Sequence, residues 1–309
     1  MSSNHEATRA LIAYRVLHET LYTYMFPVSL SQQYLHLSPR NFTYQQCEFQ
    51  QIQIDPSPEH EQSRLDYFGN LTRHITLTDP HHKLSVLADF RVVLSPRPGL
   101  EQIKSSQAWE SLAQSMHRPP TTESLEALQF LYDSPHIHCD TALADYARQS
   151  FTAGRPHLEA ALALTQQIFD EFEFDPTATD ISTPLTEVLA GRRGVCQDFA
   201  QLMIGCLRSL GLPARYISGY ILTHPAPGQP RLIGADASHA WVSVFCPNLG
   251  WIDFDPTNRC LVKHEHITLG WGRDFSDVTP LRGVVLGGGE QILEVKVTVL
   301  PADEALPED

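Results

Sequence analysis

The sequence predicts an α+β fold with two regions of strands separated by helices. Residues 1–97 contain short runs rich in β-branched and aromatic residues, separated by proline and glycine, which is typical of strands and turns. Between about 106 and 175, apolar residues recur every three or four positions, which indicates helices. After Gly211 the strand pattern returns.

The N-terminal stretches alternate between the two faces of a strand. In "YQQCEFQQIQID", Ile52 and Ile54 face one way while Phe49, Gln51 and Gln53 face the other. This alternation is typical of an antiparallel sheet with one solvated face. We therefore predict a β-sandwich-like domain over residues 1–97, which ends near the "SPRPGLE" segment.

The rest of the chain divides into three parts. Residues 98–155 are expected to form a helical connecting segment, and residues 156–301 the core that follows it. This core ends in the strand-like run "QILEVKVTVL", and the acidic residues 302–309 form a tail. No internal repeat is found.

The composition excludes some functions and compartments. The chain has 309 residues and a formal net charge of −14 without a basic block, which disfavours binding to nucleic acid or to an anionic membrane. There is no apolar signal core and no long apolar run, so we expect a cytoplasmic protein without a membrane segment. The six scattered cysteines form no CxxC pair and are expected to be reduced.

One helix places a cysteine at its start. From residue 195 to residue 210 the chain is apolar on nearly all sides, which predicts a buried helix. Gly211 and Pro213 suit its C-terminal end. Cys196 then lies in the first turn, where free N–H groups and the helix dipole favour a thiolate. The alternative is a cysteine that only packs, as most buried free cysteines do.

A histidine and two acids follow in an order that a thiol triad can use. His239 begins the strand "HAWVSVF", and "GWIDFDPTN" contains Asp253 and Asp255. A hairpin joining these strands can place His239 beside either acid, because strand alternation puts both acids on one face. The residues alone leave the choice of acid open, although Asp255 ends its strand.

Three segments resemble one known family. The segments "GVCQDFAQLMIGCLRSLGLPARYISGY", "SHAWVSV" and "GWIDFDPTN" are similar to the core of the transglutaminase-like superfamily. The segments "YRVLHETLYTY", "LHLSPR" and "DYFGN" resemble the β-rich N-terminal region of its bacterial members. This resemblance implies a papain-like core in which Cys196 is the nucleophile, His239 the base and Asp255 the acid that orients it.

The implied chemistry is acyl transfer at an amide or peptide bond through a thioester. Hydrolysis of a peptide or protein substrate is the expected outcome. One alternative is transfer to an amine, as in a transglutaminase, and another is a non-catalytic peptide-binding protein on the same fold. The backbone N–H of Cys196 suits an oxyanion donor, and no cofactor is implied. The sequence does not indicate the oligomeric state.

Three further residues are predicted to contact the substrate: Trp241, Asp236 and Asp198. Trp241 shares a strand face with His239, and Asp198 follows Cys196 by two residues, where it can also cap the helix. Histidine clusters occur at 81–82, 136–138 and 264–266, but none has the paired spacing of a structural zinc site. We therefore predict no metal.

Overall fold

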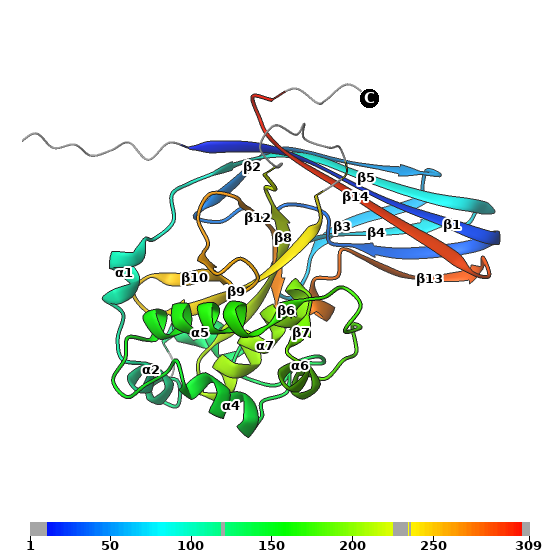
Figure 1. The fold of residues 1–309 in the computed structure, drawn as a ribbon. Helices are drawn as coiled ribbons and strands as arrows, with labels where there is room; N and C mark the ends of the chain where they lie inside the picture. Colours follow the sequence, from blue (N-terminus) through cyan, green and yellow to red (C-terminus); the bar gives the residue numbers. More distant parts are fainter. Residues whose placement is uncertain (1–10, 119–120, 225–233, 235, 305–309) are drawn as a thin grey trace, which may run out of the picture.

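The computed structural model describes residues 11–118, 121–224, 234 and 236–304. The fold is α+β, as predicted. Figure 1 shows the helices gathered below one sheet, while a long curled sheet extends away from them. Within the described residues, no helix is both long and apolar enough to span a bilayer.

The curled sheet has seven strands, and all of them pair antiparallel. The central strand is β1, and β5 and β14 pair with the same stretch of it, so they lie on its opposite sides. The strands are β1 (Ile12–Leu35), β2 (Gln45–Asp55), β3 (His60–Leu65), β4 (Leu71–Leu77), β5 (His81–Leu94), β13 (Leu281–Gly287) and β14 (Gln291–Pro301).

The pairing of β1 with its neighbours β5 and β13 is interrupted at one level of the sheet. Val28 of β1 pairs with His81 on one side and Gly287 on the other, and the register is irregular at this point. Proline lies beside the break in β1 and between β4 and β5. Gly287, Gly288 and Gly289 have positive φ angles of 93°, 81° and 66° between β13 and β14, a conformation that glycine adopts without steric cost.

The parts of the sheet on the two sides of this interruption pack against each other. Buried residues of β4, such as Ile75, share one hydrophobic cluster with buried residues of β5, such as Val86. Tyr24, from the middle of β1, and Leu35, from its end, belong to the same cluster. The sandwich-like shape therefore comes from one sheet that curls over itself.

The C-terminal strands lie with the N-terminal sheet. We expected residues 281–301 to belong to the core, but β13 and β14 pair with β1 along its length. The apolar alternation of β14 identifies a strand without identifying its partner, because each β14 residue pairs with a β1 residue more than 260 positions earlier in the sequence. Of the predicted acidic tail, residues 305–309 lie outside the described residues.

A second antiparallel sheet has the order β11-β10-β9-β8-β12. Its strands are β8 (Ala214–Ile221), β9 (Ser238–Cys246), β10 (Gly250–Asp255), β11 (Cys260–Leu261) and β12 (His266–Gly272). One face of it shares a core with the helices, and strands β8 and β12 also pack on the N-terminal sheet. The two sheets therefore hold each other in place.

The helical part begins with short helices and continues into the core. The helices are α1 (Leu100–Lys104), α2 (Trp109–Ser115), α3 (Thr122–Leu128), α4 (Thr141–Arg148), α5 (His157–Glu171), α6 (Leu185–Gly191) and α7 (Cys196–Ser209), with a 3-10 turn at Phe275–Asp277. Two residue pairs form the short parallel strands β6 (Glu173–Phe174) and β7 (Arg193–Gly194).

Helix α7 is the buried central helix that the sequence predicts. Every residue from Asp198 to Arg208 is buried. The chain leaves the helix at Gly211, whose φ of 78° suits a left-handed terminating residue. The ends of the Leu143 and Leu185 side chains approach Gly205 closely, so a larger residue would have to displace these two side chains.

Candidate active site

Cys196 is the first residue of α7, and its thiol is partly exposed. The turn before it is fixed by Asp198, whose Oδ2 accepts the N–H of Val195 at 2.8 Å and the hydroxyl of Thr179 at 2.6 Å. Gly194 is required beside this carboxylate, because a Cβ there would lie 2.6 Å from it. Asp198 is buried and caps the helix, and its contact with a substrate stays a prediction.

His239, near the start of β9, lies between the thiol and an acid. Its Nε2 is 2.7 Å from Oδ2 of Asp255, which leaves Nδ1 as the nitrogen for the thiol. Burial lowers the pKa of His239, but hydrogen bonds to Asp255 and then Cys196 outweigh burial and raise it above the ordinary value. The three predicted triad residues therefore meet in the structure.

Asp255 is completely buried at the end of β10. Its Oδ1 accepts the backbone N–H groups of Thr257 at 2.9 Å and Asn258 at 3.1 Å. Its Oδ2 faces His239, the side-chain amide of Asn258 at 2.7 Å and Nε2 of His266 at 2.8 Å. Burial alone would raise the pKa of Asp255, but the two histidines hold it well below the ordinary value.

Asp253 has a different role. Its Oδ2 accepts Nη1 of Arg97 at 2.6 Å and the indole N–H of Trp241 at 3.2 Å. Both partners of the ion pair are buried. Asp253 is thus the structural acid, and Asp255 is the one beside His239.

Two other predicted substrate contacts are structural. Trp241 is fully buried, and its ring stacks on His239 with 6.0 Å between the centroids. Asp236 forms a bridge to Val297, and its Oδ2 accepts the N–H of Val299 at 2.8 Å. Trp241 supports the imidazole, and Asp236 ties the start of β9 to β14. Both side chains are buried, and their contact with a substrate stays a prediction.

Sequence reasoning did not identify three residues around the triad: Arg97, Asn258 and His266. Asn258 follows Asp255 by three residues in "DPTN", where side chains commonly bond to nearby backbone. His266 belongs to the histidine cluster at 264–266, which was considered only as a metal site. Arg97 lies 156 residues before its partner, and no sequence pattern pointed to it.

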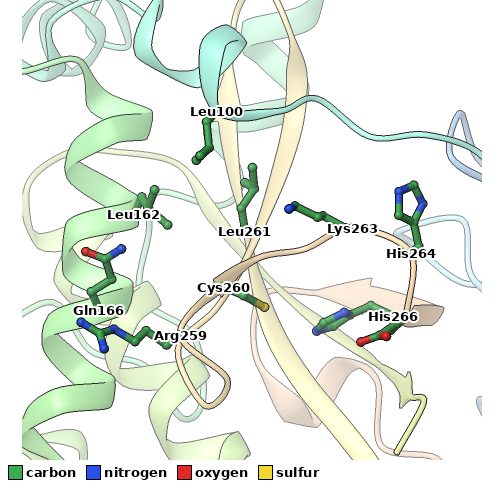
Figure 2. A pocket seen from close by; sticks show the side chains of 10 residues that line it. Leu100, Leu162, Gln166, Arg259, Cys260, Leu261, Lys263, His264 and His266 are labelled. Atoms are coloured by element: carbon green, nitrogen blue, oxygen red, sulfur yellow. The ribbon is translucent and has the colours of Figure 1, made fainter. Parts of the chain in front are cut away.

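A cavity of about 460 Å³ is lined in part by His266. Figure 2 shows Lys263, His264 and His266 on the chain segment along one side of it, with Leu162 and Gln166 opposite. Cys196, His239 and Asp255 do not line it. The cavity therefore borders His266 rather than the thiol of Cys196.

Comparison with family models gives two matches. Residues 144–256 match the model described as the transglutaminase-like superfamily, and this range contains Cys196, His239 and Asp255. Residues 14–93 match the bacterial transglutaminase-like N-terminal region, which here forms most of the curled sheet.

Individual proteins agree with these matches. An uncharacterized protein from Mycobacterium tuberculosis is 40% identical over 295 residues, which cover 93% of this chain and 92% of that protein. A protein-glutamine gamma-glutamyltransferase from Pseudomonas aeruginosa is 32% identical over 137 residues, 42% of this chain and 19% of its own length. A crystal structure from Cytophaga hutchinsonii, provisionally described as a cysteine protease, has a TM-score of 0.74 and 18% identity, with 96% of this chain and 93% of that chain covered. The last comparison concerns the fold alone.

Proposed function

The chain belongs to the transglutaminase-like superfamily, and from this premise we propose that it catalyses acyl transfer at an amide or peptide bond through Cys196. One observation carries the proposal: His239 contacts the thiol and a fully buried carboxylate at once. Such a chain of groups generates a thiolate and an imidazolium, which is how cysteine nucleophiles are activated.

The geometry suggests a role for each group. The Cys196 sulfur attacks the carbonyl carbon, and the first N–H of α7 faces the oxygen on which negative charge develops. His239 donates its proton to the departing amine, and a thioester remains on Cys196. Asp255 keeps the imidazole oriented and stabilises its charged form throughout.

The thioester then passes to an acceptor. Water activated by His239 yields a carboxylic acid and restores the thiol, whereas a primary amine yields a new amide. We favour hydrolysis of a peptide or protein in the cytoplasm. Transfer to an amine remains the second candidate, because the relative from Pseudomonas aeruginosa is named for that reaction.

A peptide library incubated with and without a primary amine distinguishes these outcomes. We expect mass spectra to show cleaved or deamidated peptides that depend on Cys196, with little change when the amine is added. Amine-modified peptides that dominate the products would establish transfer instead. A Cys196→Ala protein that produces the same peptides would refute the thiol mechanism.

A further inference from the structure

We propose that His266 is a positioning residue for the reaction of Cys196, and that it acts as a second, neutral imidazole on Asp255. It would fix the carboxylate and confine the positive charge to His239. The inference rests on the proposed function, because it concerns the same thiol, but it adds a residue outside the three-residue triad.

The first support is geometric. Oδ2 of Asp255 lies 2.7 Å from Nε2 of His239 and 2.8 Å from Nε2 of His266. The histidines come from β9 and β12, and β8 lies between these strands. Trp241 contacts both rings, stacking on His239 at 6.0 Å and meeting the edge of His266 at 5.1 Å. Two separate strands and one buried indole therefore hold both rings on a single oxygen.

The second support is electrostatic. Two imidazolium ions on one buried oxygen would repel each other, so one ring is expected to be neutral. Burial lowers the pKa of His266, and the positive charges of His239 and Arg97 add to this despite the opposing effect of Asp255. The pKa of His239 moves upward. The environment thus moves the pKa values of two histidines that share one partner in opposite directions, as acid–base sites often do.

The third support concerns the other ring nitrogen. His266 is almost fully buried, and its Nδ1 has no hydrogen-bond partner among the described residues. A neutral ring that donates through Nε2 leaves only a lone pair at Nδ1. A charged ring would instead bury an unpaired N–H donor, which costs more. The unpaired Nδ1 therefore agrees with a neutral donor.

Among the described residues, the other charged or titratable groups that interact with this cluster are Cys196, Arg97 and Cys260. Cys196 lies on the far side of His239, and Arg97 is paired with Asp253. Burial and then Asp255 raise the pKa of Cys260 to about 12, so this thiol stays protonated near neutrality. None of these groups supplies a further proton donor to Asp255.

The same three side chains could in principle hold a metal, since their ligand atoms lie within 4.8 Å of one another. In the hydrogen-bonded arrangement, however, each Nε2 carries a proton toward Oδ2, which also accepts the amide of Asn258. A metal would have to displace these protons. Activity that disappears with a chelator and returns with zinc would therefore overturn the proposal.

The experiment measures the rate at which iodoacetamide alkylates Cys196 across pH, which needs no substrate. His266→Leu removes the donor, and His266→Gln keeps an N–H near the same place. Without its second donor, Asp255 interacts more strongly with His239. In the plot of alkylation rate against pH, the inflection caused by loss of the His239 proton should therefore move to higher pH in His266→Leu. The lost orientation should also reduce peptide turnover by about 10- to 100-fold.

Two controls separate positioning from general damage. His266→Gln should retain the wild-type inflection and turnover within a few fold. His157→Leu, at a buried histidine outside this cluster, should leave the inflection unchanged. If folded His266→Leu has the wild-type inflection, His266 is only structural. The same conclusion follows if His266→Gln shows the same changes as His266→Leu. A thiol whose reactivity does not depend on His239 would instead refute the proposed function itself.

Discussion

Asp255→Asn should lower turnover by roughly four orders of magnitude, as the same change in a triad acid can. The carboxylate is completely buried between two imidazoles, so no other charge can replace it. Asparagine keeps the shape but loses the charge that holds the pKa of His239 above its ordinary value. The measurement is kcat/KM on a peptide found in the library assay, with folding followed by circular dichroism.

The matched control is Asp89→Asn in the N-terminal sheet. Asp89 is also paired with a basic side chain, Arg15, at 2.8 Å, but it takes no part in the site. Its replacement should leave turnover unchanged. If a folded Asp255→Asn protein keeps wild-type turnover while Asp253→Asn loses it, the third member of the triad has been misassigned.

Arg97→Met should destabilise the protein by about 3–5 kcal/mol, the usual cost of leaving one member of a buried ion pair without its partner. Arg97 and Asp253 are 2.6 Å apart, and their side chains are only 5% and 6% exposed. Among the described residues, the variant leaves this buried carboxylate with the indole of Trp241 as its hydrogen-bond donor and with only the more remote charge of Arg215 for compensation. Urea unfolding monitored by tryptophan fluorescence measures the change in the free energy of unfolding.

Two companion variants test this explanation. Arg97→Met combined with Asp253→Leu removes both charges and should recover much of the lost stability. Arg15→Met breaks an ion pair whose arginine is 43% exposed, so it should cost less than about 1 kcal/mol. If Arg15→Met and Arg97→Met lower the free energy of unfolding equally, burial of the Arg97–Asp253 pair is not the reason for its contribution to stability.

The triad could be predicted because each member has a local signal. Cys196 precedes an unusually apolar helix, His239 begins a strand, and Asp255 ends one before a proline. The choice between Asp253 and Asp255 needed the family resemblance, because strand alternation places both on one face. In the structure, side chains of β9 contact side chains that lie diagonally across from them on β10. His239 therefore meets Asp255, and Trp241 meets Asp253.

Features that depend on distant partners could not be predicted. Nothing local in β14 indicates that it pairs with β1, and nothing near Arg97 indicates Asp253. Trp241 was expected to face a substrate because it shares a face with His239. The indole is completely buried among His239, His266 and the apolar side chains of its cluster, and burial of this kind is decided by tertiary contacts rather than by alternation.

The activation of Cys196 by His239 is tested most directly by brief alkylation with iodoacetamide at neutral pH, followed by peptide mapping. The six cysteines are all free, so they compete for the reagent in one experiment. Cys196 should be modified first, and His239→Ala should remove this advantage. Cys47, Cys139 or Cys260 reacting well before Cys196, or an unchanged rate at Cys196 in His239→Ala, would contradict the account.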